Sequence, residues 1–166
     1  MNNFPKLFEG HYDYLLQEVL ESIDAAVLVF DHGYEVIYAN EAADDVFGGV
    51  KGRLIGESIK RLIPKDKESH FNSIVSALNT SKHHEIQLQG KKEFIGLRAT
   101  SHFFYAEGKL AKFKNESAYI LVLRDITWRR AIEGELETAL DHLKIVGRKV
   151  AYRIEHPSIL DEFPLD

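Results

Sequence analysis

The hydrophobic pattern of this chain changes period twice, and that order limits the folds open to it. Residues 25–38 have the pattern of two strands joined by the tight turn Asp31-His32-Gly33. Residues 41–79 change to the three- and four-residue spacing of helices, and residues 84–123 return to strands. Strands and helices do not alternate one by one, which argues against a parallel α/β fold. The order predicts an α+β domain with a five-stranded antiparallel sheet and short helices collected on one face.

Local signals predict where the helices of this domain lie. Asn40 is expected to cap a helix from Glu41 to Phe47, because its side chain can accept a backbone hydrogen bond at a helix start. A helical turn is expected at residues 57–62. A longer helix is expected from about Lys67 to Asn79. Its apolar face consists of Phe71, Ile74, Val75 and Leu78.

The second half of the pattern predicts three strands, at residues 84–89, 93–105 and 118–123. Between them, Gly90-Lys91 is expected to turn the chain, and residues 106–117 are expected to form a polar loop.

An amphipathic helix is predicted at each end of the domain. Within residues 1–23, Leu15, Val19 and Ile23 continue an apolar face that begins at Phe8 and Tyr12.

The second terminal helix is predicted at residues 128–155, where apolar residues follow spacings of four, three, four, three and four. This is the a/d seam of a coiled coil. The seam residues are Ile132, Leu136, Ala139, Leu143, Val146 and Val150. Packing of this helix on its own domain is the alternative, but its position after the last strand favours a partner helix and a homodimer. Residues 156–166 are expected to form a flexible tail.

The composition excludes several classes of function. A net charge of −5 argues against broad electrostatic binding of nucleic acid or of an anionic membrane. The longest apolar runs, Ala25–Phe30 and Ala118–Leu123, are too short to cross a bilayer. The chain has no cysteine, which excludes disulfides, thiolate metal sites and chromophores attached through sulfur. We expect a cytoplasmic protein without membrane insertion.

No catalytic motif is evident in the sequence. It lacks a phosphate-binding glycine loop, a Gly-x-Ser-x-Gly segment and a His-Glu-x-x-His segment. His83, His84 and Glu85 are the strongest metal-binding run, but neighbouring strand residues point to opposite faces of a sheet. We therefore predict neither an enzyme nor a metal site. An unrecognised small-molecule enzyme that uses an interior cavity is the alternative.

Three blocks of residues, taken in order, resemble the PAS domain family. The first runs from Ser22 to Asp31 and continues through Tyr38–Ala43 and Phe47-Gly48. The second is Leu54-Ile55-Gly56 leading to Leu62-Ile63-Pro64, and the third is Asp125-Ile126-Thr127 followed by Arg129-Arg130. The similarity covers about residues 15–130, and the domain itself is assigned to residues 24–127.

The resemblance implies a sensory domain with a small interior pocket and a signalling junction at Asp125, Ile126 and Thr127. His70 resembles the axial histidine of haem-binding oxygen sensors of this family, and His84 also falls where those sensors have a histidine. The arginines of their pocket are not matched. Haem is therefore one cofactor hypothesis, with flavin or a small metabolite as weaker ones. The function expected is a stand-alone sensor that binds a small ligand and signals by altered association. A ligand-free dimerisation or adaptor module, bound to a signalling protein such as a kinase or regulator, is the alternative.

Overall fold

The computed structural model describes residues 13–114 and 117–156, and the chain divides into two compact units, Met1–Thr127 and Trp128–Asp166. The N-terminal part of the first predicted helix and most of the predicted tail lie outside the described residues.

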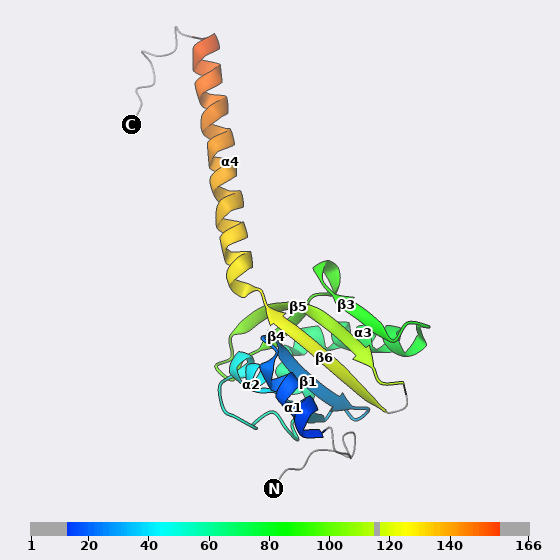
Figure 1. Cartoon of the computed structure of the whole chain (residues 1–166). Coiled ribbons are helices and arrows are strands. Elements are labelled where there is room, and N and C mark those ends of the chain that lie inside the picture. Colours follow the sequence, from blue (N-terminus) through cyan, green and yellow to red (C-terminus); the bar gives the residue numbers. More distant parts are fainter. Residues whose placement is uncertain (1–12, 115–116, 157–166) are drawn as a thin grey trace. The chain divides into compact units, whose positions relative to one another are not determined.

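The first unit is built on one antiparallel sheet (Figure 1). Its strands are β1 Ala26–Asp31, β2 Val36–Ala39, β3 Glu85–Leu88, β4 Phe94–Leu97, β5 Phe103–Lys112 and β6 Ala118–Asp125. Their order in space is β2-β1-β6-β5-β3, and β4 also pairs with β5. The first and last strands therefore meet at the centre of the sheet, where β1 pairs with β6 along its whole length.

The strands β3 and β4 occupy one position in this sheet. β3 pairs with residues 108–111 of β5, and β4 pairs with residues 103–106 of the same strand, both opposite the edge that β6 occupies. Between them, residues 89–93 bulge out opposite Glu107 and include the short 3-10 turn η4, Gly90–Lys92. The six strands thus fill five positions, and the predicted five-stranded antiparallel sheet is confirmed. The predicted turn at Gly90-Lys91 is present, but the chain continues along β5 in the same direction.

Two predictions for the second half of the sequence are wrong. Residues 93–105 do not form one strand, because the chain reverses after β4: the Ser101 N–H donates to the Arg98 carbonyl at 2.8 Å. Ser101 adopts the left-handed conformation, with φ of 62°, that such a tight reversal needs. Residues 106–112 are the body of β5 and not a polar loop. Glu107 and Lys109, on the face of β5 opposite to Phe104 and Leu110, hid its strand pattern, because only alternate residues enter the core.

The helices of the first unit lie before β1 and between β2 and β3. They are α1 Asp13–Ser22, α2 Glu41–Phe47 and α3 Glu68–Thr80, with the 3-10 turns η2 Ile59–Leu62 and η3 Lys65–Lys67 before α3. The predictions for residues 41–47 and for the buried face of α3 are confirmed. Helix α4, Thr127–Glu155, begins at the last residue of the first unit and continues in the second, and it has no buried residue.

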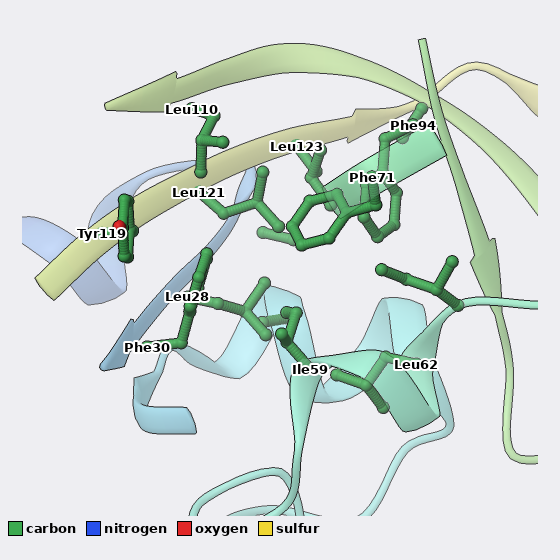
Figure 2. Packing of buried hydrophobic residues seen from close by; sticks show 14 of the residues in the cluster. Leu28, Phe30, Ile59, Leu62, Phe71, Phe94, Leu110, Tyr119, Leu121 and Leu123 are labelled. Atoms are coloured by element: carbon green, nitrogen blue, oxygen red, sulfur yellow. The ribbon is translucent and has the colours of Figure 1, made fainter. Parts of the chain in front are cut away.

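The two faces of the sheet carry different clusters of apolar side chains. Alternate residues of the central strands, such as Leu28 on β1 and Leu121 on β6, point to the face where η2 and α3 contribute Ile59 and Phe71 (Figure 2). The residues between them form a smaller cluster on the opposite face. Its buried members are Val27, Val29, Tyr38 and Ala118, and Leu20 of α1 packs against them. The sheet is therefore covered on both sides over its β1 end.

Asn40 joins three elements of the fold through its buried side chain. Its Oδ1 accepts hydrogen bonds from the Ala43 N–H at 3.0 Å and from the Val27 N–H at 2.9 Å. Its Nδ2 donates to the carbonyls of Leu20 and Ala25, both at 3.0 Å. The predicted cap of α2 is confirmed, and the same amide also fixes the end of α1 and the start of β1.

Glu21 adds a second link between α1 and the sheet. Its carboxylate accepts hydrogen bonds from the Tyr38 hydroxyl at 3.1 Å and from the Glu41 N–H at 2.9 Å. Burial first, and the charge of Glu21 second, raise the pKa of Tyr38 well above its usual value. The tyrosine therefore remains a neutral donor at physiological pH.

Replacing Asn40 with Ala is expected to lower the free energy of unfolding by about 3 kcal/mol, because a buried N–H and two part-buried carbonyls lose their partner. Urea denaturation measures this change. The matched control is Asn72→Ala, since the Asn72 side-chain oxygen accepts no hydrogen bond, and its effect should stay within about 0.5 kcal/mol. Equal losses in the two variants would contradict the role given to Asn40.

Candidate functional site

The interior, where the family resemblance implies a pocket, is filled by aromatic rings. Phe94 lies 5.9 Å from Phe71 and 6.3 Å from Phe104 between ring centroids, and Phe47 lies 5.1 Å from Phe104. Gly96 makes room for this packing, because a Cβ atom at that position would come within 2.2 Å of the Phe104 ring. The rings are packed at distances typical of aromatic pairs in protein cores.

A cavity of about 20 Å³ remains beside His70, between α3, β3 and β4. Its lining includes Phe71 and Phe94, with Lys67 and Glu93 as further polar residues. This volume is close to the minimum that one water molecule needs. A haem or flavin at this place would therefore require the aromatic rings to move apart.

The two histidines of the haem hypothesis lie in different surroundings. His70 is an exposed residue of α3 whose side chain borders the cavity. His84 is exposed just before β3, where its carbonyl accepts a hydrogen bond from the Lys112 N–H, and it does not line the cavity. In the described part of the chain, no three histidine, aspartate or glutamate side chains cluster in a way that would hold a metal ion.

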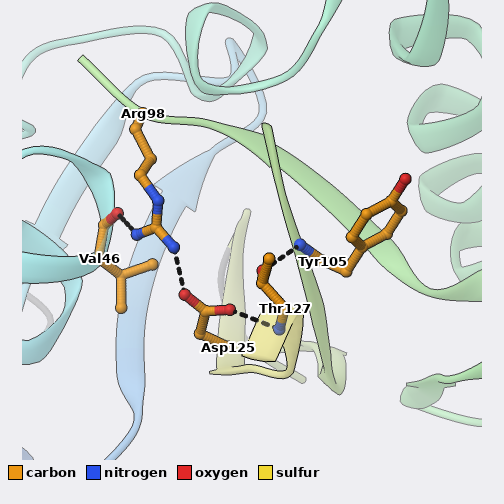
Figure 3. Close-up of polar contacts among 5 residues, drawn as sticks. All are labelled: Val46, Arg98, Tyr105, Asp125 and Thr127. Carbon is orange, nitrogen blue, oxygen red and sulfur yellow. Dashed lines mark hydrogen bonds and ion pairs between the residues drawn. The ribbon is translucent and has the colours of Figure 1, made fainter. Parts of the chain in front are cut away.

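The predicted junction residues lie at the end of β6 and are bonded to β5. The Ile126 N–H donates to the Tyr105 carbonyl at 2.8 Å, and the Tyr105 N–H donates to the Thr127 hydroxyl at 3.0 Å. The Asp125 carboxylate accepts the Thr127 N–H at 2.9 Å, as a capping side chain does at a helix start (Figure 3). Ile126 is buried. These contacts hold the three consecutive residues against β5 and fix the first residue of α4.

Arg98 connects this junction with the interior, and the sequence analysis did not identify it. One guanidinium nitrogen donates to the Val46 carbonyl at the end of α2, and the other forms an ion pair with Asp125 (Figure 3). The guanidinium carbon also lies 4.6 Å from the centre of the Phe104 ring, within the range of a cation–π contact. A single side chain therefore touches a core ring, α2 and the capping carboxylate.

Opposing effects set the protonation of Asp125. Burial alone would raise the pKa of this carboxyl group, but the hydrogen bonds from Thr127 and the Arg98 charge outweigh burial and lower it. Asp125 is therefore the charged partner of Arg98 at neutral pH.

Arg98 also lines an open cleft of about 340 Å³. Asp44 is the most buried polar residue of this cleft. The Asp44 carboxylate accepts the Gly52 N–H at 2.9 Å and so closes the loop that follows α2. Burial raises the pKa of Asp44 above its usual value. We assign this residue a structural role, because one carboxylate oxygen holds the Gly52 N–H and the other is buried.

The six predicted seam residues all lie on α4 and are exposed in this chain, with Leu143 67% and Val150 51% exposed. None of the helices in the described residues is long and apolar enough to cross a membrane.

Comparisons with known proteins agree with this geometry. The family model of the PAS domain matches residues 23–127. Among solved structures, the chain is similar to the PAS domain of a protein from Colwellia psychrerythraea, with 22% sequence identity and a TM-score of 0.59. This similarity covers 69% of the present chain and 98% of the other. No curated protein matches the sequence.

Two further solved structures show the same fold at lower identity. An RNA-binding light-oxygen-voltage receptor is 19% identical, with a TM-score of 0.62, over 85% of this chain and 41% of that one. The PAS domain of a LuxR-family transcriptional regulator from Burkholderia thailandensis, solved in complex with ethanol, is 14% identical, with a TM-score of 0.55. That match covers 66% of this chain and 96% of the other.

The antiparallel sheet, the helices packed on it and the polar contacts at the end of β6 define a domain of the α+β class. The chain belongs to the PAS domain family.

Replacing Arg98 with Ala is expected to lower the free energy of unfolding at neutral pH by about 1–2 kcal/mol. The loss is smaller than for a fully buried ion pair, because both side chains are about a quarter exposed. Arg98→Lys should recover only part of it, since a lysine cannot contact Val46 and Asp125 with a planar fork. Full recovery by lysine would contradict the bridging geometry.

The stability difference between the wild-type chain and Asp125→Asn should depend on pH. Because folding lowers the pKa of Asp125, the carboxylate stabilises the fold above the ordinary carboxyl value of 3.8. This contribution is lost as the pH falls through the lowered pKa of the folded state. Urea denaturation between pH 7 and pH 3 should therefore show a difference that is full at pH 7 and shrinks in acid. A difference that is constant over this range would contradict the assignment.

Proposed function

We propose that this chain is a PAS signalling and dimerisation module whose output passes from the core through the Asp125–Thr127 junction into α4. The observation that carries the proposal is a series of three contacts, from the Phe104 ring to Arg98, from Arg98 to Asp125, and from Asp125 to Thr127. A shift of the core rings changes the position of the guanidinium, and the guanidinium holds the carboxylate that caps α4. Two arrangements of such a network would be a bistable element.

The packed interior supports the ligand-free form of this function. The cavity beside His70 holds about one water, so the resting domain fills its core with its own side chains. The exposed apolar seam of α4 supports association with a second copy of the chain. An adaptor of this kind acts by changing its association with its own copy or with a signalling protein such as a kinase or regulator.

A sensor that binds a small ligand is the second candidate. The specific observation in its favour is that His70 and Glu93, both polar, border the interior cavity beside Phe71 and Phe94. Ligand entry would then require the rings to separate, and that motion would reach Arg98 through Phe104. Of the cofactors considered, haem through His70, with His84 as a second histidine, is the most specific hypothesis, and flavin or a small metabolite are weaker ones.

We propose no enzymatic activity and no nucleic-acid binding for this module. The RNA binding of one structural neighbour is not carried over, because a net charge of −5 opposes a polyanion. A cytoplasmic location remains part of the proposal.

The proposed coupling is tested by measuring self-association. Sedimentation of the wild-type chain should show a dimer, and Leu143→Asp, which places a charge in the seam, should give a monomer with an unchanged fold. Arg98→Ala should change the dimer dissociation constant by about 5-fold or more, since coupling between sites is typically of that size. Asp141→Ala, off the seam of α4, is the control. A monomeric wild-type chain, or an unchanged dissociation constant in Arg98→Ala, would remove the basis of the proposal.

The two candidate functions differ in whether the interior of the domain binds a cofactor. We expect the protein purified with haem supplied during expression to be colourless, because the cavity is far smaller than a haem. Ultraviolet–visible spectra of the oxidised and reduced protein check this. A Soret band that disappears in His70→Ala would instead establish the haem sensor, and His84→Ala would show whether the second histidine takes part.

A further inference from the structure

We infer that α4 pairs with α4 of a second copy in an antiparallel orientation. This inference rests on the proposed dimerisation and adds the direction of the pair, which decides whether the two sensory domains lie at the same end of the helix pair or at opposite ends. The sizes of the seam residues and the charges beside the seam favour the antiparallel orientation.

The seam residues pack in matched layers only when the two helices are antiparallel. In the heptad of this seam, residues 136, 143 and 150 occupy a positions, and residues 132, 139 and 146 occupy d positions. In an antiparallel pair each a residue faces a d residue of the partner. Leu136 then faces Val146 of the second copy, and Leu143 faces Ala139, so that large and small side chains complement each other. In a parallel pair each residue faces its own copy, and Ala139 against Ala139 leaves a gap at the middle of the seam. One antiparallel register, centred near residue 141, uses all six seam residues.

The charged residues that flank the seam favour the same register. In the heptad of this seam, Glu135 and Lys149 both occupy g positions, and g positions face each other in an antiparallel pair. Glu135 of one copy then lies opposite Lys149 of the other, and the symmetry of the dimer makes this pair twice.

A parallel pair would join g positions to e positions and offers no such match. There Glu135 would face Leu140 and Lys149 would face Ile154. In the antiparallel register Leu140, which is 48% exposed, instead meets Leu140 of the second copy beside the two-fold axis. The arrangement therefore covers an apolar residue that lies next to the six-residue seam.

Cysteine cross-linking of the full chain tests the orientation directly, because the natural sequence contains no cysteine. A mixture of Leu136→Cys and Val146→Cys chains, one of them tagged, should form a mixed disulfide-linked dimer on mild oxidation. Leu136→Cys alone should not cross-link, since its two copies would lie ten residues apart along the helix pair, about 15 Å. Cross-linking of Leu136→Cys with itself would overturn the antiparallel orientation while leaving the proposed dimerisation intact. No cross-link in any combination, together with a monomeric mass, would overturn both.

A charge exchange provides a second measurement that needs no cysteine. Glu135→Lys should raise the dimer dissociation constant by about 5-fold, because two attractive pairs become repulsive. The double variant Glu135→Lys with Lys149→Glu should restore the wild-type value. Glu137→Lys, with the same change in net charge on the outer face of α4, is the matched control and should have little effect. A double variant that stays as weak as the single one would overturn the orientation.

Discussion

The buried Asn40 side chain makes hydrogen bonds with four backbone groups, and the arrangement of the first unit depends on it. Its amide oxygen caps α2 and accepts the Val27 N–H at the start of β1, and its amide nitrogen donates to the carbonyl of Ala25 and to that of Leu20 at the end of α1. These elements come from separate stretches of sequence, and besides apolar contacts only a few directional bonds, such as those of Glu21, also fix their mutual positions among the described residues. A fully buried amide with all its contacts satisfied gives the core a single arrangement, because any other one leaves polar groups without partners.

The central strands link the packed core to residues 125–127. β6 lies between β1 and β5, and it ends in the capping residue of α4. Arg98 reaches this point from the turn between β4 and β5, and its contact with Phe104 connects the guanidinium with the packed rings. Under the proposed function, a change that moves the ring cluster would reach Asp125 through the same arginine, with or without a ligand.

The features that could be predicted from sequence depend on local signals. The Asn40 cap, the bounds of α2 and the buried face of α3 follow from residues within a few positions of one another. The family resemblance located the junction for the same reason, because Asp125 to Thr127 are consecutive. The role of Arg98 could not be predicted, since Asp125 lies 27 positions away and the strand around Arg98 was predicted to continue. The small polar run Ala99-Thr100-Ser101 was the only local signal of that turn. The size of the cavity depends on how rings from four elements pack, which no short pattern records.

The bulge between β3 and β4 has a consequence for how this domain behaves among other proteins. β3 and β4 form one outer edge of the sheet, where a long, regular strand would offer its free backbone groups to any extended chain nearby. Residues 89–93 interrupt that edge, and they place Lys91 and Lys92 on exposed positions in the middle of it. The opposite edge, β2, is only four residues long. Both borders of the sheet are thus poor templates for strand addition, so the fold resists edge-to-edge aggregation.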